Sequence, residues 1–366
     1  MLIENCKNLL YKRGPMVLAC CTSFALGSLA TAALTKTTTA ATKGPRTAAA
    51  DVRPVSFLSG LDSLPSAVEH ASLHARAHVR AVRRKHDPKP RTRSSATISL
   101  YESTTAPGVF REQGCSAARR GATGVIILDF GKPSYNGHTY GTILFSGAFA
   151  GNREITHAMA AYATGYVRCL PRGSTDHIDL ARGTSNYQPT VPSVYKAGRK
   201  WARETMELQR ALRTAKFDSN VTAAAADDVE PAWDPSFSRT HDFYRGYADS
   251  RVGHALYNYG SLDGGIVGGY WNAHQAFYVT GGMRYARPIP EIYSQAMARE
   301  WAALAQVAKK RYHSPLKFAG VMTERTAGNH GVKPHDAHRM LVRELAVQGR
   351  GTAPARVPAA YTNIHG

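Results

Sequence analysis

Short apolar segments alternate with longer amphipathic ones from residue 110 to residue 350, and this alternation constrains the fold more than any other feature. The apolar segment 121–131 is bounded by glycines, which is typical of a strand buried on both faces. Segments 194–213 and 291–312 show the apolar spacing of amphipathic helices. Repeated strand and helix units of this kind predict a parallel sheet wrapped by helices.

The segments expected to form strands are 121–131, 141–147, 177–187, 221–230, 254–262, 275–283 and 316–323, and those expected to form helices are 152–168, 194–213, 236–249, 291–312 and 334–348. About seven strands over about 240 residues predict an α/β fold of the (β/α)₈ TIM-like barrel type, regular or irregular. The alternative is a doubly wound sheet. No loop with dinucleotide-binding spacing follows an expected strand, since the glycines of 264–269 are spaced differently.

The N-terminal segment 1–34 has the pattern of a secretory signal peptide. Lys7, Lys12 and Arg13 precede the uncharged segment 16–34, which contains small residues suited to cleavage. The alternative is a single membrane anchor, because about 20 apolar residues can span a bilayer. The many Ser, Thr and Ala residues favour cleavage, so we expect a secreted protein, extracellular or associated with the cell wall.

Composition divides the rest of the chain into three parts. Residues 35–109 are rich in Ala, Thr, Pro, Lys and Arg, so we expect a flexible basic linker of low complexity. Residues 110–350 are the expected barrel domain, and residues 351–366 are the expected flexible tail. Cys115 and Cys169 follow the signal and are candidates for a disulfide in an oxidising compartment; two separately buried thiols are the alternative.

The formal net charge of +20 indicates an anionic partner, such as nucleic acid, a membrane surface or an acidic wall polymer. Export and the concentration of basic residues in the linker argue against nucleic acid. We expect membrane contact only through an uncleaved signal segment. The expected partner is therefore a polysaccharide or an anionic cell-wall polymer. The sequence contains no His-Glu-Xaa-Xaa-His motif and no paired-cysteine motif, and we expect neither a metal ion nor an organic cofactor. The alternative is a metal ion bound by His335 and His338, which are three residues apart and can share a helix face; solvated histidines at a helix start are more common.

The segment 221–230 ends in acidic residues, at the point where a buried strand would end. With Glu230 directed into the barrel, Asp228 also points inward, whereas Asp227 faces the helices; small alanines then fill the interior and valines meet the helices. Carboxylates at this end of a barrel strand lie where barrel enzymes assemble their sites. One of the pair is expected to have a raised pKa, which provides an acid and a base for glycoside hydrolysis. The alternative is a structural strand end, with Asp228 capping a loop and Glu230 paired with an arginine.

Other polar and aromatic residues lie on expected strands or just after them. Asp129 ends the segment 121–131 and is a further candidate for the catalytic site. The candidate substrate-binding residues are Trp233, Tyr257, Asn258, Tyr259, Asp263, Trp271, Gln275 and Tyr278. Aromatic faces can stack on sugar rings, while Asn, Gln and Asp form hydrogen bonds with hydroxyl groups. The alternative for the aromatic residues is packing between helices and the barrel.

The sequence Asp-Val-Glu at 228–230, the segment Val-Ile-Ile-Leu-Asp-Phe-Gly at 125–131 and the secretory signal resemble those of glycoside-hydrolase-like TIM barrels. These include the lysozyme-type family 25 and a related group of exported bacterial proteins of unknown function. The resemblance covers about residues 120–350 and implies catalysis by Asp228 and Glu230, with Asp129 as the aspartate of the first strand. The chain departs from the family after Asp129, where the usual Asp-Val-Ser is missing, and after Glu230, where Pro-Ala-Trp-Asp-Pro is not typical.

Three functions are consistent with these features. The first is a secreted glycoside hydrolase acting on cell-wall polysaccharide, with Glu230 as general acid, Asp228 as base, nucleophile or stabiliser of an intermediate, and Asp129 orienting them. The second is a non-catalytic module that binds cell-wall glycan through the same surface. The third is a nucleic-acid binder, which only the net charge favours.

Overall fold

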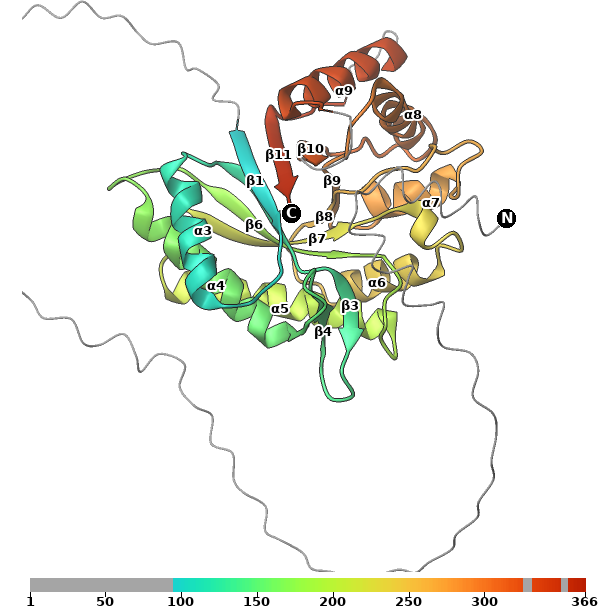
Figure 1. Ribbon diagram of the computed structural model, residues 1–366. Coiled ribbons are helices and arrows are strands. Elements are labelled where there is room, and N and C mark those ends of the chain that lie inside the picture. Colours follow the sequence, from blue (N-terminus) through green and yellow to red (C-terminus); the bar gives the residue numbers. More distant parts are fainter. Residues whose placement is uncertain (1–94, 325–330, 350–354) are drawn as a thin grey trace, which may run out of the picture. The chain divides into compact units, whose positions relative to one another are not determined.

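The computed structural model describes residues 95–324, 331–349 and 355–366. In this part of the chain, eight parallel strands form one sheet (Figure 1). The strands are β1 (Ser95–Tyr101), β2 (Gly124–Asp129), β6 (Ile178–Ser185), β7 (Val221–Asp228), β8 (Leu256–Asn258), β9 (Ala286–Pro288), β10 (Val321–Glu324) and β11 (Ala360–His365). Their order in the sheet is β10-β11-β1-β2-β6-β7-β8-β9. Neighbours follow one another in the chain, except that the last strand, β11, pairs with the first, β1. A doubly wound sheet would reverse its strand order at one point, and this sheet does not.

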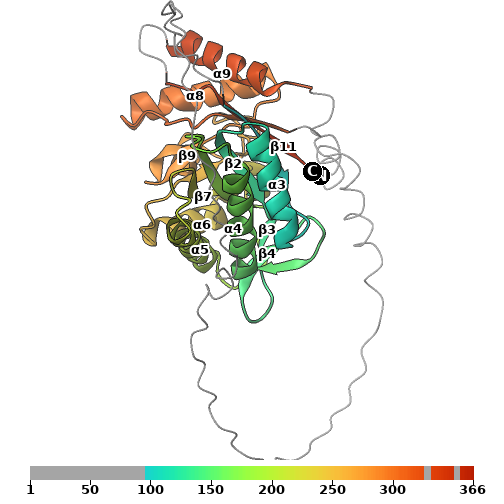
Figure 2. The same cartoon turned by 90° about the vertical axis from the view of Figure 1, so that its left-hand side faces the viewer.

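Helices connect the strands and cover the outside of the sheet (Figures 1 and 2). They are α3 (Pro107–Arg119), α4 (Asn152–Cys169), α5 (Val194–Thr214), α6 (Ser238–Asp249), α7 (Ala273–Phe277), α8 (Gln295–Arg311) and α9 (Pro334–Gly349). A 3₁₀ turn, η2 (Pro231–Trp233), follows β7, and a π-helical turn, η3 (Tyr278–Gly282), extends α7. The expected alternation of strands and helices is therefore confirmed as an α/β fold.

The sheet is curled, and backbone hydrogen bonds join the segments at its two edges. The amide of Met322 on β10 donates to the carbonyl of Pro290 at 2.8 Å, and the amide of Ile292 donates to the carbonyl of Met322 at 3.0 Å. The amide of Ala319 donates to Pro288 at 2.9 Å. The edge formed by β9 and the edge formed by β10 are thus in contact through their main chains.

Side chains alternate between the inside of the curled sheet and its helix-covered outside. The inner cluster contains Val125, Ile127, Ala181, Ala224, Ala226, Tyr257, Tyr259, Ile289, Met322 and Ile364. On β7, Val221, Ala223 and Ala225 belong instead to the outer core that packs against the helices. The expected register of this strand, with Ala224 and Ala226 inside and Val221 and Val229 outside, is confirmed.

A small antiparallel sheet is inserted between β2 and α4. It consists of β3 (Lys132–Tyr135), β4 (Tyr140–Ile143) and β5 (Phe149–Gly151). The expected strand 141–147 corresponds to β4 and lies in this insertion, outside the main sheet. In Figure 1, β3 and β4 project away from the large sheet.

Four other expectations differ from the structure. The segment 275–283 is helical, in α7 and η3, because Asn272 and Gln275 form a capping box that starts a helix there. Strand β1 and the start of α3 fall within the expected linker, and β11 falls within the expected tail. The domain therefore extends from β1 to β11, beyond the expected limits of 110 and 350. Strand β9 was not expected, because three residues with an Arg and a Pro give no strand pattern.

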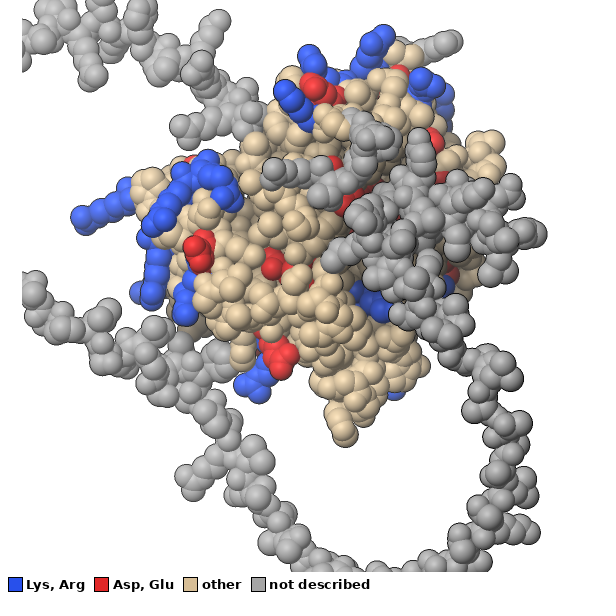
Figure 3. Space-filling model, in the orientation of Figure 1, with Lys and Arg blue, Asp and Glu red and all other residues tan. Residues whose placement is uncertain are grey.

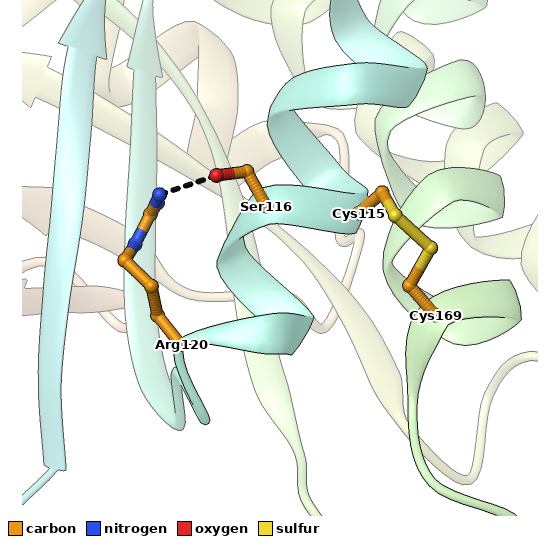
Figure 4. The surroundings of a disulfide bond; sticks show 4 residues. All are labelled: Cys115, Ser116, Arg120 and Cys169. Carbon is orange, nitrogen blue, oxygen red and sulfur yellow. Dashed lines mark hydrogen bonds between the residues drawn. A yellow bond between two sulfur atoms is a disulfide. The ribbon is translucent and has the colours of Figure 1, made fainter.

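The predicted disulfide is present between Cys115 of α3 and Cys169 at the end of α4 (Figure 4). The two Cα atoms are 5.0 Å apart, and the cysteines are separated by 54 residues. Closing a loop of that length in the unfolded chain corresponds to about 4 kcal/mol of stabilisation in the chain-entropy model. The two helices approach closely here, since a Cβ atom at Gly114 would lie 2.1 Å from the carbonyl oxygen of Tyr162.

No helix within the described ranges is long and apolar enough to cross a membrane. The expected signal segment, the alternative membrane anchor and the greater part of the expected linker lie outside those ranges.

Candidate functional site

Asp129, Asp228 and Tyr259 meet at the carboxyl ends of three strands. Asp129 ends β2, Asp228 ends β7 and Tyr259 follows β8 directly. Burial raises the pKa of the Tyr259 hydroxyl well above its usual range, and the negative charges of Asp129 and Asp228 raise it further. That hydroxyl donates to the carbonyl of Thr184, near the end of β6, at 3.2 Å. Two of the candidate carboxylates therefore converge on one buried phenol.

The two carboxylates are held differently from their neighbour Asp227. Asp129 accepts a hydrogen bond from the amide of Gly131 at 2.7 Å and is 1% exposed, and Asp228 is 4% exposed. Asp227 is also buried, but it lines a narrow crevice with Thr240 and Phe243 of α6, on the helix side of β7. Burial raises the pKa of Asp227 well above its usual range, and the charge of Asp129 adds to the effect. The environment of Asp227 thus favours a protonated carboxyl group.

Glu230 lies where the chain leaves β7, and the side chain of Asn186 fixes its backbone. The Glu230 amide donates to Asn186 Oδ1 at 3.1 Å, and Asn186 Nδ2 donates to the Glu230 carbonyl at 3.0 Å. Asn186 Nδ2 also donates to Thr240 Oγ1 at 3.1 Å, and the Asn186 amide donates to the Asp228 carbonyl at 3.1 Å. One amide side chain therefore links the Asp228–Glu230 segment to the loop after β6 and to α6.

A second acidic group lies at the same ends of β9 and β10, and it was not found from the sequence. Glu291 follows β9 and is 6% exposed, and Glu324 ends β10. The hydroxyl of Tyr293 donates to Glu291 and lies 3.4 Å from an oxygen of Glu324. The amide of Glu291 donates to the carbonyl of Gly260, the residue after Tyr259. Glu324 could have been found from the sequence, because it directly follows the expected strand 316–323. Glu291 could not, because it follows β9, which was not expected.

An aromatic rim lies in the segments that follow β6 and β7, at the end of the sheet where Asp129 and Asp228 lie. Trp233 in η2 and Tyr187, two residues after β6, are both half-buried and pack edge to face with ring centroids 5.3 Å apart. The ammonium group of Lys132, three residues after Asp129, lies 5.6 Å from the centroid of the Tyr187 ring. Trp233 was a candidate from the sequence, whereas Tyr187 and Lys132 were not.

Several other candidates have structural roles. Tyr257 points toward the amino-terminal end of the sheet, where its hydroxyl donates to Asp179 at 2.6 Å. The Asn258 side chain accepts from the amide of Gly260 and is 2% exposed. Asp263 accepts from the amide of Ala232 at 2.9 Å, and so ties the loop after β8 to η2.

The candidates from the segment after β8 pack around helices and not at the strand ends. Trp271 is 3% exposed, donates from its indole to the carbonyl of Asp234 and packs on Phe237. Gln275 caps α7. Tyr278 packs edge to face with Phe237. For Tyr257, Trp271 and Tyr278, the packing alternative is the one that the structure supports.

A groove of about 410 Å³ lies outside the sheet, between α3 and β1, and is separate from the candidate site. Apolar side chains of Ile98, Leu100 and Val109 line it, together with Tyr162 and Gln113. None of the carboxylates at the strand ends contributes to it.

The arrangement has the components needed for acid and base catalysis on a ligand that stacks on aromatic rings. Carboxylates in different environments can differ in proton affinity, as one acid and one base require. Within the described residues, no group of three or more His, Cys, Asp or Glu side chains is arranged to hold a metal ion. No family model, curated protein sequence or solved structure matches the chain, so functional assignment depends on these residues.

Proposed function

We propose that the curled sheet is a (β/α)₈ TIM-like barrel and that its carboxyl-terminal mouth is the active site of a glycoside hydrolase acting on cell-wall polysaccharide. The order of the strands and the hydrogen bonds between the β9 and β10 edges support the barrel. Barrel enzymes place their sites at the end of the strands where Asp129 and Asp228 lie. The secretory signal pattern supports export to the extracellular space or the cell wall.

The observation that carries the proposal is the convergence of Asp129 and Asp228 on the hydroxyl of Tyr259. In the proposed mechanism, Glu230 protonates the glycosidic oxygen as the bond to the leaving group breaks. Asp228 acts as base, nucleophile or stabiliser of a substrate-derived intermediate, and Asp129 orients it. The spacing of Asp228 and Glu230, about 6.6 Å along an extended chain, leaves retention and inversion of configuration both open.

The resemblance to lysozyme-type family 25 barrels is a further support for this reaction. It is limited to short motifs around Asp129 and Asp228–Glu230. We propose that the chain shares the site position and the carboxylate chemistry of that group, with a wall polysaccharide as substrate and no cofactor.

Replacement of Glu230 by Gln tests the hydrolase. The variant retains the size of the side chain but has no proton to donate, so release of reducing ends from purified peptidoglycan should fall at least 100-fold. Glu207→Gln, on the exposed face of α5, is the matched control and should keep parent activity. No turnover by the parent protein on peptidoglycan or other wall polysaccharides would contradict the proposal.

A non-catalytic glycan-binding protein is the second candidate, and the half-buried pair Tyr187 and Trp233 favours it. Aromatic faces at a rim can bind sugar rings whether or not a bond is cleaved. In that case the parent protein would bind wall polysaccharide without turnover, Trp233→Ala would weaken binding, and Glu230→Gln would leave it unchanged.

A further inference from the structure

The rim formed by Lys132, Tyr187 and Trp233 comes from three neighbouring strands of the sheet. Each residue lies in the segment that follows one of β2, β6 and β7, which are adjacent in the sheet: Lys132 begins β3, Tyr187 lies in a loop and Trp233 lies in η2. The rim is therefore on one side of the mouth, next to Asp129 and Asp228, and away from Glu291 on the β9 side.

Hydrogen bonds between loops hold this rim in place. The loop that carries Tyr187 joins the edge of β3: the amide of Thr190 donates to the carbonyl of Pro133 at 2.9 Å, and the amide of Tyr135 donates to Thr190 at 3.0 Å. The side-chain hydroxyls of Ser134 and Thr190 are 2.9 Å apart. The loop that carries Tyr187 is thus bonded through Thr190 to β3, the strand that begins with Lys132.

Trp233 is fixed from the other side. Arg239 donates to the Trp233 carbonyl at 3.1 Å, and the preceding amide of Ala232 donates to Asp263 at 2.9 Å. A rigid aromatic surface loses little conformational entropy when a ligand stacks on it. The rim has the pre-organisation of a binding surface.

The charge of the rim contrasts with that of the mouth. Asp129 and Asp228 give the mouth a negative charge, whereas Lys132 places an ammonium group 5.6 Å from the Tyr187 centroid. Among the described residues, no carboxylate lies within 4.0 Å of the Lys132 ammonium group, whereas Arg239, the other cation beside the rim, is 3.5 Å from Asp234. Lys132 is therefore the cation at the rim that is available to a ligand anion.

We propose that Lys132, Tyr187 and Trp233 form a subsite for a sugar residue that carries a carboxylate group. The ring of the sugar stacks on the aromatic pair, and its carboxylate meets the ammonium group of Lys132. Neutral sugar residues then occupy the acidic mouth, where a second carboxylate would be repelled. The inference rests on the proposed function only in that the ligand is a glycan entering this mouth.

Binding of two matched oligosaccharides tests the subsite. The probes are a hexamer of glucose units in which one terminal unit is glucuronic acid, and the same hexamer with that one carboxyl group methyl-esterified. They are titrated calorimetrically into full-length Glu230→Gln protein so that no cleavage occurs. We expect the acid form to bind roughly 3- to 10-fold more tightly than the ester at low salt, the range for one partly exposed ion pair. The preference should fall as salt is raised, because exposed charges are screened.

Variants of the rim separate its parts. Lys132→Met should abolish the preference for the acid form, and Lys132→Arg should restore it. Tyr187→Ala should weaken both ligands equally, because it removes stacking surface without changing the charge of Lys132. Thr139→Met, in the exposed hairpin between β3 and β4, is the control and should change neither affinity.

Equal binding of acid and ester by the parent, a preference that survives Lys132→Met, or binding of neither hexamer would overturn the subsite. Its failure is distinguishable from that of the hydrolase. A protein that binds the acid hexamer through Lys132 and cleaves no glycan contradicts hydrolysis alone. A protein that cleaves wall polysaccharide without a preference for carboxylated units contradicts the subsite alone.

Discussion

At the residue scale, the side chain of Asn186 determines where the proposed general acid lies. It accepts from the Glu230 amide and donates to the Glu230 carbonyl, as a neighbouring strand would, at the point where β7 has ended. Asn186 is 7% exposed, so water cannot readily replace these bonds. It belongs to the candidate site as a positioning residue.

Asn186→Asp is expected to destabilise the protein and to lower turnover. The new carboxylate keeps the acceptor for the Glu230 amide but places an oxygen opposite the Glu230 carbonyl and removes the donor to Thr240. We expect a loss of about 2–3 kcal/mol in the free energy of unfolding, measured with urea. In folded protein we expect kcat on wall polysaccharide to fall roughly 10- to 100-fold, with a smaller change in KM.

Asn136→Asp is the matched control, because Asn136 is exposed and its side-chain oxygen accepts hydrogen bonds from the amides of His138 and Thr139, which a carboxylate can also accept. That variant should match the parent in both measurements. If Asn186→Asp unfolds at the same urea concentration as the parent, the hydrogen bonds between the Asn186 side chain and the Glu230 backbone do not contribute measurably to stability.

Glu102 predicts a pH dependence of stability. Burial raises the pKa of this carboxyl group from 4.5 to about 7, against a lowering by the hydrogen bond from Gln113, and the charge of Asp129 adds to the rise. Between these two pH values the folded protein binds more protons than the unfolded chain, so stability falls as pH rises. At pH 8 the ionised group costs about 3 kcal/mol.

Glu102→Gln removes that ionisation and should raise the free energy of unfolding by up to about 3 kcal/mol at pH 8, with little change at pH 4.5. Glu112→Gln, on the exposed face of α3, should change stability little at either pH. Urea unfolding at the two pH values measures both variants. If Glu102→Gln raises the free energy of unfolding equally at the two pH values, the effect of the substitution is not electrostatic.

The catalytic candidates were easier to predict than the binding residues. Asp129 and Asp228 could be placed because each follows an apolar strand, and parallel strands bring such ends together. Tyr257 and Trp271 were placed at the site from their residue type and from their position on or after the expected strand 254–262. Neither property distinguishes an aromatic ring that binds sugar from one that packs in the core. Tyr187 could not be found because its partner Trp233 is 46 residues away, and only the sheet brings them together.

At the scale of elements, glycines set how closely the helices pack. A Cβ atom at Gly198 of α5 would lie 2.1 Å from the carbonyl oxygen of Phe243 on α6, and one at Gly246 would lie 2.1 Å from that of Tyr195. Since both obstacles are backbone atoms, the two helices must separate to admit a methyl group.

Gly198→Ala should therefore lower the free energy of unfolding by about 1–3 kcal/mol, although alanine favours helix formation. Gly108→Ala in the first turn of α3 is the control, because no heavy atom lies within 4 Å of its added Cβ. The control should be neutral or slightly stabilising in the same urea titration. If Gly198→Ala and Gly108→Ala change the free energy of unfolding equally, close packing of α5 on α6 is not the reason why residue 198 is a glycine.

The elements with strong apolar periodicity could be predicted from the sequence. Strands β1 and β9 could not, and each has a physical reason. In β1, Ser99 faces inward: its hydroxyl accepts from the amide of Ile127 and lies 2.6 Å from that of Thr362. Because β1 uses hydroxyl side chains such as Ser99 where other strands use apolar ones, its composition is that of a low-complexity linker. Strand β9 has only three residues, so its position depends on its neighbours in the sheet and not on its own sequence.

At the scale of the whole molecule, the two kinds of charge are distributed differently along the chain. The described ranges hold 21 of the 26 acidic residues but only 29 of the 46 lysines and arginines, a formal net charge of +8 out of +20. On the face shown in Figure 3, Lys and Arg side chains gather near α3 and near α8 and α9, and the centre of the face is mostly uncharged. The net charge of the chain therefore does not describe the mouth, where carboxylates predominate.

Closure of the sheet decides whether these carboxylates surround a single site. Asp129 and Asp228 lie on β2 and β7, whereas Glu291 and Glu324 lie beside the β9 and β10 edges. If the edges are joined by the amides of Ile292 and Met322, the second pair faces the first across one mouth. In an open sheet, β10 and Glu324 would be free to move away from β9.

Hydrogen exchange distinguishes these two arrangements. In a closed barrel, the amides of Ile292 and Met322 have fixed acceptors, so peptides covering 289–293 and 319–323 should exchange at least 100-fold more slowly than the exposed turn 136–139. Peptides from β7, in the middle of the sheet, provide the protected reference. Exchange of the 319–323 peptide at the rate of the turn would show an open edge, and the site would then be reduced to Asp129, Asp228, Glu230 and the rim beside them.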